Sequence, residues 1–172
     1  MLRSIRLQPT SRRRSPLRAG VVNMHEVPQE TWQEGRFGGR EQDLGRATGS
    51  VAVGLRREVI PPASSPPRAH IAEEEIFVVL RGRGTHLRGD ERVAVEAGDV
   101  AAFPTGTGLA HAFVAESGEE LEFLSIGERK DNDVITYPDS GKLLVACVAG
   151  ENGQRVDRLG RLQETEYFDG EL

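Results

Sequence analysis

The sequence has little of several things that would define common protein classes. Its single cysteine, Cys147, excludes an internal disulfide framework, and the apolar neighbours of this cysteine indicate a small buried residue. No apolar run approaches the roughly 18–20 residues that a membrane-spanning helix needs, and aromatic residues make up only 5% of the chain. The 172 residues, of which 28% are charged, predict one soluble domain in the cytoplasm without a membrane partner.

Positive charge is scarce outside the N-terminus. Residues 1–20 carry six arginines and no acid, which leaves the rest of the chain with 16 basic and 27 acidic residues. An acidic body argues against a nucleic-acid partner, because phosphate binding needs a basic face. The basic start has the composition of an organelle transit peptide. A disordered leader, or an upstream start codon with Met24 as the true start, is the simpler explanation.

Short alternating runs separated by turn residues follow one another over residues 45–150. Gly49–Ile60 alternates apolar side chains with small or polar ones, as a half-buried strand does. Glycine, proline and aspartate turns separate the further strands that we expect: Glu75–Leu80, Thr85–Arg88, Arg92–Glu96, Val100–Phe103, Ala110–Ala115, Leu121–Ile126 and Lys142–Val148. Many short strands with closely spaced turns predict an all-β sandwich or barrel.

The two ends are expected to be less regular than the barrel. Residues 21–44 form an arm in which several glycines break any helix. Residues 151–172 are more polar, and Arg155–Glu166 is either a short helix or simply a tail. Tyr167 and Phe168 are expected to pack the end of the chain against the barrel.

The stretch from Pro61 to His111 holds the residues that can carry chemistry. If the chain is extended after the prolines, Arg68, His70 and Glu74 point to one side, because alternate side chains share a face of a strand. His111 enters from a separate strand. Two imidazoles and one carboxylate are a common ligand set for non-haem Fe(II), and they serve Mn, Ni or Zn as well. We therefore predict a metal site made of His70, Glu74 and His111.

These residues resemble the two signature motifs of the cupin superfamily, which are small jelly-roll β-barrels. In the first motif, His70 corresponds to the second histidine, Glu74 to the glutamate and Gly82 to the closing glycine. The second motif is matched, with two extra residues before its histidine, by Gly98, Pro104, Gly106 and His111. The resemblance covers roughly residues 30–172 and is to the single-domain conserved-barrel cupins. It implies a cupin barrel over residues 45–150, with the irregular arm and the short tail outside it.

The sequence departs from this family pattern at two positions. Arg68 stands where the first motif has its first histidine, and Ala115 stands where an asparagine often follows the second motif. Cupins usually bind metal through three histidines and one glutamate, so the chain keeps three of the four ligands. The alternative is a metal-free pocket in which Arg68 pairs with Glu74. A guanidinium about 4 Å from a metal ion would cost roughly 4 kcal/mol per unit of metal charge.

Two functions from different classes follow from the resemblance. The first is a metal-dependent dioxygenase, decarboxylase or isomerase acting on a small anionic compound, and the second is a metal-free binding or sensing module for a sugar or carboxylate. Arg68, His86 and Phe113 are the candidate ligand-binding residues. Their alternatives are a solvent-facing arginine, a rim histidine and a core phenylalanine. A homodimer is expected, because the edge of a single cupin sheet needs a cover.

Overall fold

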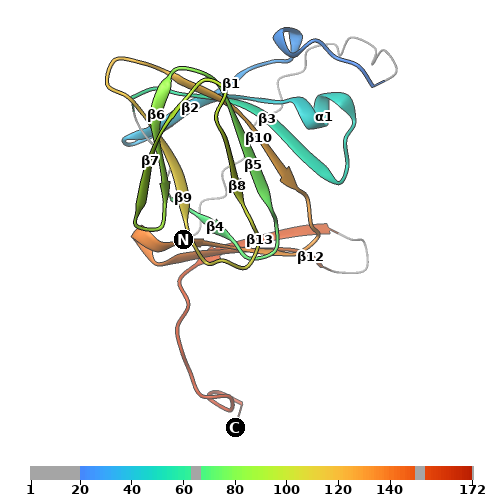
Figure 1. The fold of residues 1–172 in the computed structure, drawn as a ribbon. Coiled ribbons are helices and arrows are strands. Elements are labelled where there is room, and N and C mark those ends of the chain that lie inside the picture. The colour runs from blue at the N-terminus through green and yellow to red at the C-terminus, as the bar shows by residue number, and fades with distance from the viewer. Residues whose placement is uncertain (1–19, 63–66, 150–153, 172) are drawn as a thin grey trace.

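The computed structural model describes residues 20–62, 67–149 and 154–171, and over these ranges the regular structure is mainly strand, with little helix (Figure 1). The predicted leader, apart from Gly20, lies outside them. The strands are β1 (Glu30–Glu34), β2 (Phe37–Asp43), β3 (Val53–Ile60), β4 (Ala69–His70), β5 (Glu75–Arg81), β6 (Arg83–Arg88), β7 (Glu91–Glu96), β8 (Val100–Phe103), β9 (His111–Ala115), β10 (Leu121–Glu128), β11 (Asp133–Tyr137), β12 (Lys142–Ala149) and β13 (Gln154–Gly160). The described helices are η1 (Met24–Glu26), α1 (Leu44–Thr48) and η2 (Pro138–Ser140).

The strands form three sheets. A six-stranded sheet runs in the order β1-β2-β3-β10-β5-β8, and a three-stranded sheet runs β7-β6-β9. A four-stranded sheet, β13-β12-β11-β4, crosses beneath these two (Figure 1). All the pairings between strands are antiparallel in the described chain. The predicted all-β barrel is confirmed.

The N-terminal arm is more regular than predicted. Its strands β1 and β2 form a hairpin, and β2 extends the large sheet by pairing with β3. Gly39 lies inside β2. A Cβ atom at this position would meet the carbonyl oxygen of Val59 at 3.0 Å and the indole of Trp32 at 3.5 Å, so the close packing favours a glycine. Gly39 therefore permits a close approach between strands, whereas Gly35, with a φ of +56°, lies in the turn between β1 and β2.

The C-terminal tail also differs from the prediction. Its first part is strand β13, which pairs with β12, rather than a short helix. The rest leads away from the barrel (Figure 1), and the side chains of Tyr167 and Phe168 are 87% and 67% exposed. These two aromatic residues contact each other but do not pack the end of the chain against the barrel.

Four of the nine aromatic residues lie in the core between the six-stranded and three-stranded sheets. Phe77 of β5 contacts the rings of Phe103, Phe113 and Phe123, which come from β8, β9 and β10. Leu121 is the most deeply buried member of this cluster, with no exposed surface. Each fully buried side chain of this size contributes about 1.5–3 kcal/mol to folding.

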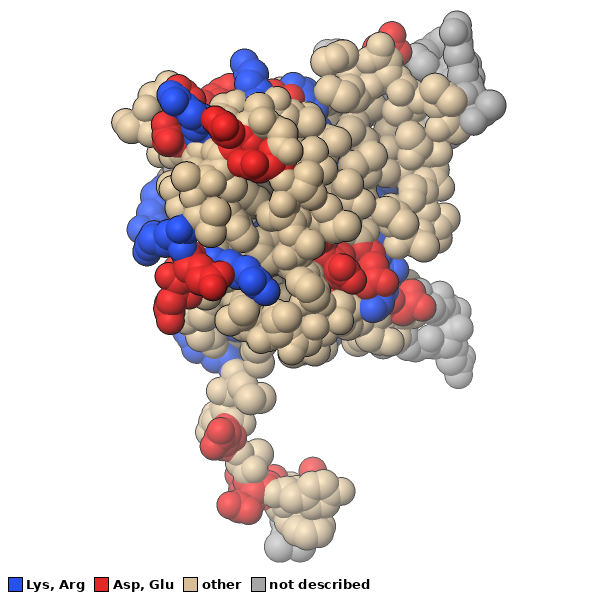
Figure 2. Space-filling model, in the orientation of Figure 1, with Lys and Arg blue, Asp and Glu red and all other residues tan. Residues whose placement is uncertain are grey.

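Charged side chains of both signs are interspersed on the face of the molecule drawn in Figure 2. Several charged residues of the described chain are paired, as in the bidentate contact of Arg40 with Glu120 at 2.8 and 2.9 Å and the contact of Arg83 with Glu119 at 3.0 Å. None of the helices in the described ranges has the length and apolar character needed to span a membrane.

Candidate metal centre

A backbone bridge places Arg68 beside His111. The amide of Arg68 donates to the carbonyl of His111 at 3.1 Å, and the amide of His111 donates to the carbonyl of Arg68 at 2.8 Å. Residues paired in this way on antiparallel strands project their side chains to the same face. His70 is two residues further along the extended chain and shares that face with Arg68. Arg68, His70 and His111 therefore face one space, as the alternation of the sequence predicted.

The carboxylate that joins them is Glu75 and not Glu74. The chain turns between Ile71 and Glu74, so the alternation that starts at Arg68 does not continue to Glu74, whose side chain is exposed. Glu75 is the first residue of β5 and shares its inward face with Phe77, which is only 3% exposed. The structure thus corrects the expected carboxylate by one residue.

Three ligand-type atoms converge inside the barrel. Oε2 of Glu75 lies 2.9 Å from Nε2 of His111 and 3.5 Å from Nε2 of His70. All three atoms are buried, and within the described part of the chain none of them makes a hydrogen bond of good geometry. The other oxygen of Glu75, Oε1, lies 3.8 Å from the guanidinium of Arg68.

The converging atoms border a small cavity with a volume of about 10 Å³, which is room for one water molecule or one ion. Its lining combines the converging side chains with the segment that leads into β9: His70, Glu73, Glu75, Phe103, Pro104, Thr107, Leu109 and His111. The ring of His111 stacks on Phe103 at 3.7 Å between centroids, which fixes the direction of the imidazole. Arg68 borders Glu75 from outside this cavity.

The charge states suit a cation. Burial opposes the ionisation of Glu75, but the contact with His111 and the charges of Arg68 and His70 outweigh it and lower the pKa of Glu75 to about 2. Burial lowers the pKa of His111 below its usual value despite the opposing effect of Glu75. At neutral pH the site therefore presents an ionised carboxylate and a neutral imidazole, the forms in which these groups bind metals.

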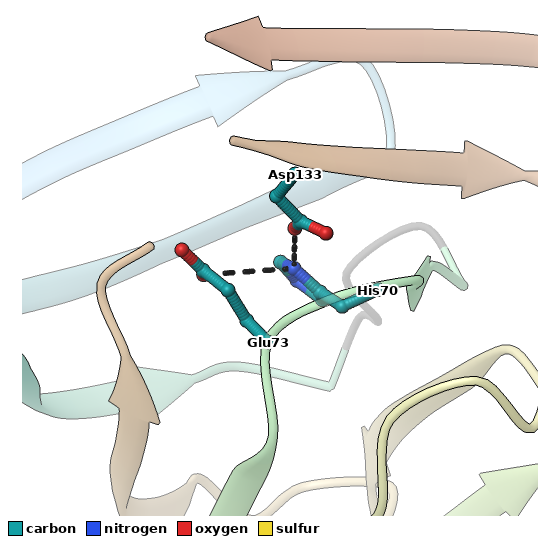
Figure 3. A group of neighbouring side chains, drawn as sticks. All are labelled: His70, Glu73 and Asp133. Carbon is teal, nitrogen blue, oxygen red and sulfur yellow. Dashed lines mark hydrogen bonds and ion pairs between the residues drawn. The ribbon is translucent and has the colours of Figure 1, made fainter. Parts of the chain in front are cut away.

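His70 also has contacts on the side away from Glu75. Its Nδ1 lies 2.6 Å from Oδ2 of Asp133 and 3.8 Å from Oε2 of Glu73 (Figure 3). His70, Glu73 and Asp133 form a second group whose spacing could hold a metal ion. One oxygen of each carboxylate already has a backbone partner, since Asp133 Oδ1 accepts from the amide of Ala72 at 2.8 Å and Glu73 Oε1 accepts from the amide of Lys130 at 2.8 Å.

The predicted ligand-binding residues are not all at the cavity. Phe113 is 2% exposed and belongs to the core cluster, so the structure gives it the core position that was its alternative. His86 is buried between the rings of Phe103 and Phe113, at centroid distances of 4.9 and 5.1 Å, rather than lying at a rim. Burial and the charge of His111 lower the pKa of His86. None of the three residues lines the cavity, although Arg68 contacts Glu75 and His86 contacts Phe103, which do.

A comparison with protein families supports the resemblance that the motifs carry. The model of the cupin domain matches residues 56–127, which hold both motifs and every converging side chain. The chain contains a cupin domain. No protein of curated function matches the chain at a significant level.

Solved structures match this chain over much of its length. A candidate sugar phosphate isomerase from Acidithiobacillus ferrooxidans is 26% identical, with a TM-score of 0.70 over 86% of this chain and 99% of that one. A cupin-superfamily sugar phosphate isomerase from Silicibacter pomeroyi is 22% identical, with a TM-score of 0.71 over 82% of this chain and 92% of that one, and shows the shared fold. A predicted oxalate decarboxylase from Thermotoga maritima is 26% identical, with a TM-score of 0.56 over 64% of this chain and 99% of that one.

Two residues of the site were missed in the sequence. For Glu75 a signal was available, because Glu75, Phe77 and Val79 are alternate residues and so lie on the same face of a strand. Phe77 and Val79 are both 3% exposed, so this face is the buried one. For Asp133 the sequence held no signal, since this residue lies 63 positions from His70 and follows a polar segment.

Proposed function

We propose that this cupin binds one divalent transition-metal ion, of Fe, Mn, Ni or Zn type, through His70, Glu75 and His111. The observation that supports this most is the convergence of three buried ligand atoms that have no hydrogen-bond partner in the described chain. Buried polar atoms are normally paired, so a group of unpaired ones facing a common point is best explained by a shared cation.

The donor set and its spacing fit such an ion. Ligand atoms bound to one metal at about 2.1 Å lie roughly 3–3.5 Å from one another, and Oε2 of Glu75 lies 2.9 and 3.5 Å from the two imidazole nitrogens. Two imidazoles and one carboxylate form a three-residue set that leaves further coordination positions for a substrate. The alternative group around Nδ1 of His70 is a weaker candidate, because its carboxylates already accept hydrogen bonds from backbone amides.

Arg68 makes a small anion the best-supported class of substrate. Burial disfavours its charged form, but Glu75 and Glu58 outweigh burial and raise the pKa of Arg68, so its guanidinium stays positive. The guanidinium thus adds a positive charge beside the carboxylate of Glu75. A guanidinium can also bind a phosphate or carboxylate through two parallel hydrogen bonds.

Within this class, we propose isomerisation of a small sugar phosphate as the reaction, with decarboxylation or dioxygenation of a small carboxylate as the runner-up. The candidate isomerase is similar over most of both chains, whereas the predicted decarboxylase covers less of this one. A bound metal ion would supply Lewis-acid polarisation of a substrate oxygen. Arg68 would hold the anionic group, and the exposed residues Pro104, Thr107 and Leu109 form the side of the cavity from which a ligand would enter.

A second candidate function is a metal-free module that binds or senses a small anion. The contact of Arg68 with Glu75 at 3.8 Å favours it, because a paired carboxylate is a poorer metal ligand. Metal binding by untagged protein separates the two functions. We expect close to one equivalent of Mn, Fe, Ni or Zn per chain after reconstitution. Less than about 0.2 equivalents of every metal would leave only the binding module.

Adjacent glutamates provide a matched pair of variants for this test. Glu75→Gln should raise the Kd for Mn(II) at least about tenfold, because it removes a charged ligand atom. Glu74→Gln makes the same chemical change on an exposed side chain and should leave the Kd within twofold. Equal Kd values for the two variants would contradict the assignment of Glu75 as a ligand.

A further inference from the structure

We infer that Asp133 is a positioning residue that holds His70 in the tautomer whose unprotonated Nε2 points at Glu75. This inference deepens the proposed function, because it concerns how one metal ligand of that site is oriented. It is carried by the two hydrogen bonds that Asp133 accepts, one from the ring of His70 and one from the backbone of Ala72.

The pairing of strands brings Asp133 to His70. His70 of β4 lies opposite Ile135 of β11, and Asp133 is two residues before Ile135 on that strand. A diagonal neighbour at this offset lies on the same face of a sheet. The side chain of Asp133 is only 1% exposed and faces the imidazole edge that is turned away from Glu75 (Figure 3).

Both oxygens of Asp133 are used as acceptors. Oδ1 accepts from the amide of Ala72 at 2.8 Å, a donor that is fixed by the backbone. Oδ2 lies 2.6 Å from Nδ1 of His70, so that nitrogen carries the ring proton and donates it to the carboxylate. Since a neutral imidazole has one N–H, Nε2 of His70 is left with its lone pair. This nitrogen is the one that lies 3.5 Å from Oε2 of Glu75.

Glu73 does not serve as an equivalent partner. Its Oε2 lies 3.8 Å from Nδ1 of His70, which is too long for a hydrogen bond, and its Oε1 accepts from the amide of Lys130. Asp133 is thus the residue that sets the proton position. A carboxylate behind a ligand histidine also makes the imidazole a stronger ligand.

Replacing Asp133 by asparagine tests this role, because a side-chain amide has one acceptor oxygen whereas a carboxylate has two. In Asp133→Asn the amide oxygen can satisfy Ala72 or His70 but not both. If the oxygen stays with Ala72, the NH₂ group faces Nδ1 and drives the ring proton to Nε2. If the oxygen turns to His70, the NH₂ group opposes the amide of Ala72, and the ring is held less firmly.

The tautomer can be measured directly in metal-free protein by two-bond ¹H–¹⁵N correlation of the imidazole rings. The sequence has four histidines, so His→Gln substitutions assign each signal. In the parent protein we expect His70 to be protonated on Nδ1. A His70 ring protonated on Nε2 in the parent would overturn the inference without any variant that must fold. In Asp133→Asn we expect a population protonated on Nε2.

Metal affinity provides the second readout. Asp133→Asn should raise the Kd for Mn(II) by about 10–100-fold, whereas Asp131→Asn, the same change at an exposed position two residues earlier, should leave it within twofold. A parent-like tautomer together with a parent-like Kd in Asp133→Asn would overturn the inference. His111→Gln should also weaken binding, and an undiminished affinity in that variant would place the ion on the Asp133 side of His70 and overturn it too. A parent that has the expected tautomer but binds no metal would contradict the proposed function alone.

Discussion

Nε2 of His111 and Oε2 of Glu75 lie 2.9 Å apart, although the two residues begin different strands in different sheets. The contact joins the six-stranded sheet to the three-stranded sheet at the edge of the aromatic core. Phe103, the register partner of Glu75 on β8, stacks on His111 and holds the ring in place. The site is therefore an extension of the core in which ligand-type atoms replace apolar ones.

The first prediction concerns the acid stability of metal-free protein. The pKa of Glu75 is about 2 in the folded state, against about 4.3 for an unfolded glutamate. A carboxyl group whose pKa is lowered on folding stabilises the protein above its unfolded pKa, and this contribution is lost as the pH falls through the window from about 4.3 to about 2. Between pH 4 and pH 3 the parent should lose about 1 kcal/mol more of its free energy of unfolding than Glu75→Gln.

Urea unfolding at a series of pH values checks this, with the fluorescence of Trp32, the single tryptophan, as the signal. Glu74→Gln is the control and should follow the parent curve. Parallel curves for the parent and Glu75→Gln below pH 4 would show that Glu75 does not carry the effect.

The second prediction concerns anion binding by Arg68. Hydrogen bonds to charged groups contribute about 1.5–3 kcal/mol, so Arg68→Gln should weaken the binding of inorganic phosphate by about tenfold or more. The same variant should keep or improve Mn(II) affinity, because a positive charge near the ion is removed. Arg92→Gln makes the same charge change at an exposed position. Calorimetric titration with phosphate measures the affinity of both variants. An equal loss of phosphate affinity in the two would show that the effect comes from net charge and not from the position of Arg68.

The third prediction concerns Gly82, between β5 and β6. Its φ of +86° and that of Gly118, +82°, both favour glycine, so alanine should cost about 1–2 kcal/mol at either position. At Gly82, however, a Cβ atom would run into the backbone carbonyl of Glu120, whereas at Gly118 nothing lies within 4 Å. Gly82→Ala should therefore cost a further 1–3 kcal/mol or so. Thermal or urea unfolding measures the difference, and equal losses would contradict the close approach of β10.

The fourth prediction concerns the core at Leu121, which has no exposed surface. Leu121→Ala should lower the free energy of unfolding by about 2–5 kcal/mol, because it removes buried methyl groups and leaves a cavity. Leu162→Ala, at a side chain that is 76% exposed in the tail, should stay within about 0.5 kcal/mol of the parent. A large loss in Leu162→Ala would instead mean that the tail packs against another surface in solution.

Much of the barrel could be predicted from the sequence because its signals are local. Alternating side chains and turn residues placed β3, β5 to β10 and β12 within a few residues, and the motif residues indicated the cupin fold together with His70 and His111. The same local reasoning missed β1 and β2, because glycines that allow strands to approach closely look like glycines that form turns.

By itself the sequence determined the fold class and the two histidines, because strand alternation and motif spacing are properties of neighbouring residues. Only the tertiary structure showed that Glu75 is the carboxylate facing the two histidines and that Asp133 contacts His70 from the other side. The alternation of side chains that indicated Glu74 holds only along an unbroken strand, and the chain turns before Glu75 starts a new strand. Asp133 reaches His70 through the pairing of β11 with β4, a contact across 63 positions that no local pattern encodes.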